Sequence, residues 1–221
     1  MAQDNGYQAV GVDIDVNEEG AGMMKAGAII LSGGKSSRMG TNKALLKINE
    51  KTNIERMADA LNLSFIDIIL VTNHPEDYQF LEVKMVSDLY PGQGPLAGVH
   101  AGLLASPFET NFVVACDMPF ASAELAELLV KKSSGFDAVI PIINGVQHPL
   151  FAVFQKRAAD VAAQMIEAGQ LRMKHLLERL NVLYVTEKDL QAYSSIDLER
   201  VFFNMNHPSE YEDAKKWAED R

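Results

Sequence analysis

AGAIIL (residues 26–31) is an uninterrupted apolar run, and the glycine-rich, basic segment SGGKSSRMGTNK (residues 32–43) follows it directly. A short apolar run without polar alternation is typical of a strand that is buried on both faces of a parallel sheet. Farther along, Thr52 and Glu55 have the spacing of a capping box for a helix that ends near Leu63. Strand, loop and helix in this order predict an α/β fold.

The alternation of strand and helix continues to the end of the chain. Further strands are expected at residues 67–72, 83–88, 111–117, 136–142, 148–154 and 182–186. Further helices are expected at residues 75–81, 95–106, 122–132, 156–168, 172–180 and 208–219. Because repeated β–α units need right-handed crossovers, this order predicts a three-layer, Rossmann-like, mostly parallel sheet with helices on both faces.

Residues 1–24 differ in composition from the rest of the chain. They contain four glycines, five acidic residues and no Lys or Arg. Such a segment cannot bury enough apolar surface to fold, so we expect a mobile N-terminal extension over 1–24 and one domain over 25–221. Met24 lies just before the first strand, and we expect the functional protein to start near it.

The composition is that of a globular protein, with 48% hydrophobic and 23% charged residues among 221. The net charge of −10 disfavours attraction to nucleic acid or to an anionic membrane surface. No apolar run reaches the ~18 residues that a membrane span needs, and the start lacks a secretory signal, so we expect a cytoplasmic protein. The single cysteine, Cys116, cannot form an intrachain disulfide.

The segment after the first strand has the chemistry of an anion-binding loop. Gly33 and Gly34 allow backbone N–H groups to approach an anion closely, and Arg38 and Lys43 can neutralise phosphate oxygens. The segment matches neither the P-loop pattern nor the dinucleotide-binding fingerprint. The alternative is an ordinary strand-to-helix turn.

Asp117 ends the most apolar strand, NFVVACD (111–117). A buried carboxylate costs free energy unless a cation pairs with it, and Mg²⁺ needs few protein carboxylates when phosphate and water supply its other ligands. Asp117 is therefore the best candidate metal ligand. The alternative is that it caps the helix that begins near Ser122.

A second carboxylate, Asp88, ends the strand before a pliant glycine-containing loop. Pro95 then opens a helix whose positive end faces the same edge of the sheet. Asp88 can bond a ribose hydroxyl, reach the metal through a water molecule, or simply begin a turn. Gly98 and Gly102 share a helix face, where either a flat base or the neighbouring strand can approach closely.

In open α/β sheets, ligands bind beyond the carboxyl ends of the strands. The informative segments all fall at such ends, at residues 32–43, 72–74, 88–98 and 117–120. Their coincidence on one edge indicates a site for a small anionic ligand.

The chain contains, in this order, LSGGKSSRMGTNKALL, GPLAGVHAGL, CDMPF, HPLFAVF and FFNMNHPSEY. With these segments it closely resembles the molybdenum cofactor guanylyltransferases, whose fold is like that of the nucleotide-diphospho-sugar transferases. The resemblance covers about residues 26–220. Its first motif is shared with many sugar-phosphate and cytidylyl transferases, whereas GPLAG and Asn204-x-Asn206 are narrower signals.

The resemblance implies transfer of GMP from GTP to molybdopterin, with Mg²⁺ as the cofactor and release of pyrophosphate. It implies that Arg38, Lys43 and Asp117 are catalytic and that Asp117 also binds the metal. It further implies that substrate and nucleotide are held by Leu31, Ser32, Gly33, Gly34, Lys43, Asn73, Asp88, Asp117, Asn204 and Asn206. Molybdoenzyme-maturation proteins are the implied protein partners. The alternatives are a cytidylyl- or other nucleotidyltransferase of the same fold and a non-catalytic nucleotide sensor.

Overall fold

The computed structural model describes residues 24–33, 42–191 and 195–219, and these form a central eight-stranded sheet. Its strands are β1 (Met24–Leu31), β4 (Phe65–Val71), β5 (Lys84–Val86), β6 (Thr110–Ala115), β7 (Ala138–Ile143), β8 (Val146–Gln147), β9 (Phe151–Gln155) and β10 (Val182–Thr186). The order is β10-β7-β9-β6-β1-β4-β5, and β8 pairs with β7. Four pairs of neighbouring strands are parallel: β1 with β4, β1 with β6, β4 with β5, and β7 with β10. β9 is antiparallel to β6 and β7. The predicted mostly parallel α/β sheet is confirmed.

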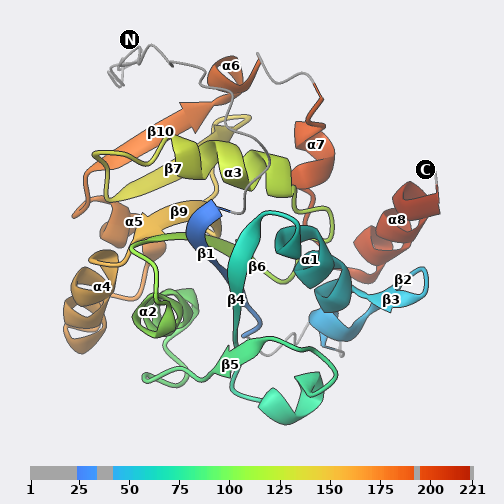
Figure 1. The fold of residues 1–221 in the computed structure, drawn as a ribbon, viewed down its shortest axis with the longest axis horizontal. Helices are drawn as coiled ribbons and strands as arrows, with labels where there is room; N and C mark the ends of the chain where they lie inside the picture. The colour runs from blue at the N-terminus through green and yellow to red at the C-terminus, as the bar shows by residue number, and fades with distance from the viewer. Residues whose placement is uncertain (1–23, 34–41, 192–194, 220–221) are drawn as a thin grey trace.

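Helices cover both faces of the sheet, as predicted (Figure 1). α1 (Asn53–Asn62) and α3 (Ala123–Lys131) lie on one face, and α2 (Pro95–Ala105), α4 (Ala158–Glu167) and α5 (Met173–Leu177) lie on the other. Shorter helical turns follow at η1 (Lys43–Leu45), η2 (Pro75–Tyr78), α6 (Glu187–Leu190) and α7 (Leu198–Val201), and α8 (Pro208–Glu219) comes last. Thr52 forms the predicted capping box with Glu55, and Ser122 caps α3 through the backbone N–H of Leu125.

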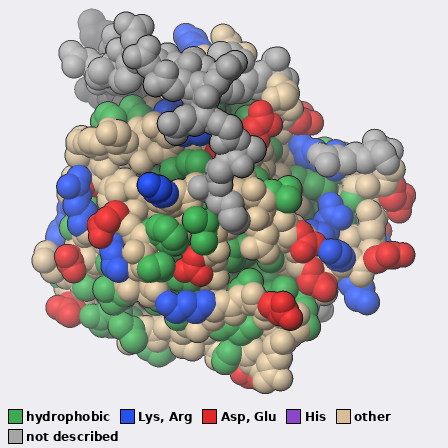
Figure 2. Space-filling view, viewed as in Figure 1, with side chains coloured by type: hydrophobic (Ala, Val, Ile, Leu, Met, Phe, Trp, Pro, Cys, Tyr) green, Lys and Arg blue, Asp and Glu red, His purple; other side chains and the backbone are tan. Residues whose placement is uncertain are grey.

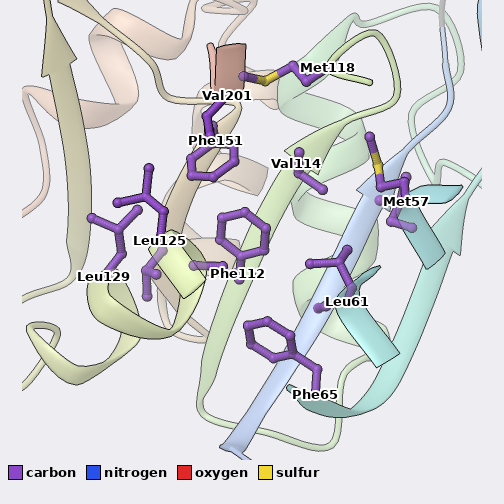
Figure 3. Packing of buried hydrophobic residues seen from close by; sticks show 14 of the residues in the cluster. Met57, Leu61, Phe65, Phe112, Val114, Met118, Leu125, Leu129, Phe151 and Val201 are labelled. Carbon is purple, nitrogen blue, oxygen red and sulfur yellow. The ribbon is translucent and has the colours of Figure 1, made fainter. Parts of the chain in front are cut away.

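The central strand β1 is buried on both sides, which explains its continuous apolar run. Ala28 and Ile30 face the core beneath α1 and α3, whereas Ile29 and Leu31 face the core beneath α2 and α4. Figure 3 shows the first of these cores, where aromatic and aliphatic side chains interdigitate between sheet and helices. Phe112 packs edge-on against Phe151, with ring centroids 4.9 Å apart.

A small hairpin and the C-terminal helix lie beside each other at one side of the molecule (Figure 1). The hairpin consists of β2 (Lys47–Ile48) and β3 (Lys51–Thr52), which pair antiparallel. The Tyr211 hydroxyl on α8 donates a hydrogen bond to the backbone carbonyl of Lys47 at 2.6 Å. Ile48, Met205 and Ala214 form a separate small core there. Sequence periodicity did not predict this hairpin.

The described surface mixes acidic and basic side chains on the face shown in Figure 2. Within the described residues, no helix is both long and apolar enough to span a bilayer. The extension predicted for residues 1–24 lies outside the described residues except for Met24, which begins β1. The helix expected at 75–81 is only the single turn η2, and the strand expected at 83–88 is the shorter β5.

Candidate functional site

Four of the predicted site residues follow the carboxyl ends of four adjacent strands. In the order β6-β1-β4-β5, these ends lead into Asp117, Ser32, Asn73 and Asp88. Backbone hydrogen bonds extend the ladder past the strand ends: Cys116 N donates to Leu31 O at 3.0 Å, and Ser32 N donates to Val71 O at 2.9 Å. The four segments therefore leave the sheet side by side at one edge.

Lys43 is positioned by its own helical turn and by the C-terminal segment. Asn42 caps η1 by accepting a hydrogen bond from Ala44 N, so Lys43 stands at the first position of that turn. The Lys43 Nζ donates a hydrogen bond of 2.8 Å to Asn206 Oδ1, although 163 residues separate the two in sequence. This contact brings the basic residue and the Asn204-x-Asn206 segment together.

Asp117 lies next to the same segment. Its backbone carbonyl accepts a hydrogen bond of 2.9 Å from Met205 N, between the two asparagines. Burial raises the pKa of the Asp117 carboxyl above its ordinary value, while the charge of Lys43 opposes the rise. The carboxylate of Glu210 raises the pKa further. Lys43 and Asp117 are thus close enough to interact electrostatically on one side of the sheet.

A magnesium ion that arrives with a phosphorylated ligand fits this arrangement. In the part of the chain that the structure describes, no three His, Cys, Asp or Glu residues are grouped to hold a metal by themselves. A metal held by protein ligands alone therefore does not fit. Mg²⁺ is usually bound by one or two carboxylates, with water and phosphate completing its octahedron. Asp117, whose charge is costly where it lies, is the carboxylate that could hold such an ion.

Replacing Asp117 with asparagine should raise the melting temperature of the metal-free protein. The carboxyl pKa is raised in the folded state, so the wild type loses stability as pH rises from the ordinary value of 3.8 through the folded pKa. Asparagine keeps the shape without the charge. We expect a gain near neutral pH, about 2–4 °C for each kcal/mol relieved, that shrinks toward acid pH. Thermal melts of both proteins in a chelating buffer test this, and an equal or lower melting temperature for Asp117→Asn at neutral pH contradicts it.

Asn73 and Asp88 form a pair at the other end of the edge. The Asn73 Nδ2 donates to Asp88 Oδ2 at 3.2 Å, and Asp88 N donates to Asn73 Oδ1 at 3.0 Å. Burial raises the pKa of Asp88, and the hydrogen bond from Asn73 opposes this. A Cβ on Gly98 would lie 3.8 Å from Asp88 Oδ1 and 3.3 Å from Leu31 Cδ2. The glycine thus lets α2 approach β1 beside the pair.

Gly102 shows the same close approach more strongly, because a Cβ there would meet Ile29 Cγ2 at 2.4 Å. Of the two interpretations of the glycine face on α2, the packing of the neighbouring strand is therefore confirmed. Gly94 precedes the helix with φ +73°, a conformation that favours glycine. α2 consequently begins at the site edge, with its N-terminal N–H groups directed there.

The remaining predicted residues divide into four cases. Leu31 is buried against α2, and Gly33 is exposed, with no atom of the described residues within 4 Å of the place that a Cβ would take. The Asn204 side chain donates to the carbonyl of Phe202 at 3.0 Å, so it stabilises its own segment. Gly34 and Arg38 lie outside the described residues.

Two side chains that sequence reasoning missed hold the site segments in place. The Asn53 Nδ2 donates to the backbone carbonyl of Cys116, directly before Asp117, at 2.5 Å. The Glu210 carboxylate accepts from the backbone N–H groups of Asn206 and His207. Glu210 follows a His-Pro start by three residues, which is the capping spacing that could have revealed it. Asn53 has no comparable signal, because its partner is 63 residues away.

Comparisons with known proteins show which proteins this chain is similar to. The family model of the MobA-like NTP transferase domain matches residues 28–185. A probable molybdenum cofactor guanylyltransferase from Pelotomaculum thermopropionicum is 37% identical and aligns over 90% of this chain and 96% of its own length. Another from Clostridium perfringens is 34% identical over 89% of this chain and all of its own length.

Solved structures show the same similarity. The molybdopterin-guanine dinucleotide biosynthesis protein A of Archaeoglobus fulgidus superposes with a TM-score of 0.76 at 29% identity, over 88% of this chain and all of that chain. The 2-C-methyl-D-erythritol 4-phosphate cytidylyltransferase of Thermus thermophilus superposes with a TM-score of 0.66 at 16% identity, over 89% and 100% of the two chains. The second likeness shows the fold alone.

Proposed function

We propose that this chain, which belongs to the MobA-like NTP transferase family together with the probable molybdenum cofactor guanylyltransferases, transfers GMP from GTP to a molybdopterin cofactor. The product is the guanine dinucleotide form of the cofactor, and pyrophosphate is released. The main support for this proposal is that Lys43, Asn206 and Asp117 lie close together at one edge of the sheet.

In the proposed reaction, a terminal phosphate oxygen of molybdopterin attacks the α-phosphorus of GTP. The bond from the α-phosphorus to the bridging oxygen breaks, and its electrons leave with pyrophosphate. Because a phosphate monoester is largely ionised at neutral pH, the protein needs no general base. Its contribution is positioning and charge neutralisation.

Lys43 supplies the positive charge for the triphosphate in the described part of the site. Its Nζ is held by Asn206 at 2.8 Å, so the ammonium is positioned before the nucleotide binds. Arg38, from the same glycine-rich segment, is proposed to add a second positive charge. Mg²⁺ bound at Asp117 would further neutralise the phosphate charge.

The two ends of the edge are proposed to hold the two substrates. Asn73 and Asp88 lie near the N-terminus of α2 and would hold the nucleoside. Asp88 would hydrogen-bond a ribose hydroxyl. Leu31, Ser32, Gly33 and Gly34 would contact the nucleotide through backbone atoms. Asn204 and Asn206 would lie on the pterin side, joined to the phosphate site through Lys43.

Replacing Asn73 with alanine should mainly weaken nucleotide binding. The change removes both hydrogen bonds that hold Asp88, and hydrogen bonds of this kind contribute about 0.5–1.5 kcal/mol each. Since Asn73 is exposed and Asp88 is only partly buried, we expect the KM for GTP to rise roughly five- to tenfold, with kcat changed by less than about threefold. Steady-state kinetics test this against Asn62→Ala, which removes an exposed asparagine at the end of α1. A large fall in kcat with an unchanged KM would contradict the nucleoside role.

The proposed function is tested by incubating the purified protein with Mg²⁺, molybdopterin and each of the four NTPs in turn, while pyrophosphate is measured. We expect release with GTP that depends on molybdopterin. Release with CTP instead would indicate a cytidylyltransferase. Binding of GTP without pyrophosphate release would indicate a nucleotide sensor. The molybdoenzyme-maturation partners and the cytoplasmic location stay predictions.

A further inference from the structure

Tyr78 lies beside the site but outside every motif that the sequence singled out. It ends η2, the turn after β4, and only 1% of the residue is exposed. The Asn42 Nδ2 donates to the Tyr78 hydroxyl at 2.7 Å, and the same hydroxyl lies 2.5 Å from Ser32 Oγ. An amide nitrogen only donates, so the phenolic proton is free to donate to Ser32. Burial raises the pKa of Tyr78, which keeps that proton in place at neutral pH.

The partners of Tyr78 are the residues that set the position of the two charged groups. Asn42 caps η1 and directly precedes Lys43. Ser32 directly follows β1, whose last residue, Leu31, accepts a hydrogen bond of 3.0 Å at its backbone carbonyl from the N–H of Cys116, the residue before Asp117. The Tyr78 hydroxyl therefore joins the segment that carries Lys43 to the strand ends that carry Ser32 and Asp117.

We propose that Tyr78 is a positioning residue, whose hydroxyl fixes the segment that carries Lys43 relative to Ser32 so that the ammonium meets the triphosphate. This inference rests on the proposed function and deepens it. Lys43 has a long, flexible side chain, so the location of its backbone limits where the charge can lie. Small displacements of such groups are costly for binding and for transfer. Tyr78 itself contacts no reacting atom in this account.

The test is a double-mutant cycle between Tyr78→Phe and Lys43→Ala, measured by calorimetry as the affinity for GTP with Mg²⁺. In the wild-type background, loss of the hydroxyl should weaken binding roughly five- to tenfold, as expected for about two lost hydrogen bonds. In the Lys43→Ala background, the same change should weaken binding by less than about twofold, because the group that it positions is already gone. Non-additivity of this kind separates positioning from a general loss of stability.

If Tyr78→Phe folds poorly, Asn42→Ala tests the same contact, because it removes the amide that donates to the Tyr78 hydroxyl. It should show the same coupling to Lys43→Ala. Tyr184→Phe is the matched control, because it makes the same chemical change on β10, at the far edge of the sheet. We expect it to leave the affinity within about twofold of wild type.

Two results would overturn the inference: an unchanged affinity in Tyr78→Phe, or a loss that persists in full in the Lys43→Ala background. Because the experiment measures GTP affinity, it tests the role of Tyr78 in binding separately from any effect on catalysis. If the wild type binds GTP but releases no pyrophosphate with molybdopterin, the proposed function fails while the cycle still decides the role of Tyr78.

Discussion

Replacing Asp117 with asparagine should lower the rate of GMP transfer by on the order of 10²-fold or more, the loss expected when a main electrostatic element of an active site is removed. Asp117 is the carboxylate that we propose binds Mg²⁺, and burial makes its charge unfavourable without a cation. The same variant should be more thermally stable than the wild type in the absence of metal. Loss of activity together with gain of stability cannot come from misfolding.

The control for Asp117→Asn is Asp67→Asn. Asp67 lies on β4 opposite Gly27, toward the other end of the sheet, so the variant makes the same chemical change away from the site. It should transfer GMP at close to the wild-type rate. Single-turnover measurements of pyrophosphate release at saturating GTP and Mg²⁺ compare the three proteins. Near-normal transfer by Asp117→Asn would show that the metal is held elsewhere.

Replacing Lys43 with alanine is expected to have an effect of similar size, on the order of 10²-fold in kcat/KM for GTP. The change removes the ammonium that Asn206 holds, and nothing else in η1 replaces that charge. It also removes the positive charge that lowers the pKa of Asp117, so that pKa should rise further. The pH at which activity appears should therefore move upward as well.

Lys47→Ala is the control for Lys43. Lys47 is exposed on β2, four residues along the chain, and its loss should change kcat/KM by less than about twofold. Kinetics across a range of pH, with GTP varied at fixed molybdopterin, give both kcat/KM for GTP and the pH at which activity appears. Equal activity of the two lysine variants would mean that Lys43 does not act on the triphosphate.

The sequence predicted those features of the fold that depend on local patterns. Capping at Thr52 and Ser122 follows from side chains that bond to backbone three residues away, so both helices could be placed. The apolar run of β1 likewise follows from burial on both faces. β2 and β3 escaped prediction because each has two residues, which is too short for any periodicity.

For the candidate site, sequence patterns could place only the residues that follow the ends of strands. The sheet order brings Asp88 and Asp117 to one edge, as the α/β rule requires. No spacing could show that Lys43 bonds Asn206, or that Tyr78 bonds both Ser32 and Asn42, because these contacts join segments far apart in the chain. The roles assigned to the candidate site residues stay predictions, and two of these residues, Gly34 and Arg38, also lie outside the described residues.

The most direct test is a crystal structure of the protein with Mg²⁺ and a GTP analogue that cannot be cleaved between the α- and β-phosphates. We expect one triphosphate at this edge, with the Lys43 ammonium on its phosphates and the metal bonded both to Asp117 and to a phosphate oxygen. A triphosphate bound away from Lys43, or a metal coordinated without Asp117, would contradict it.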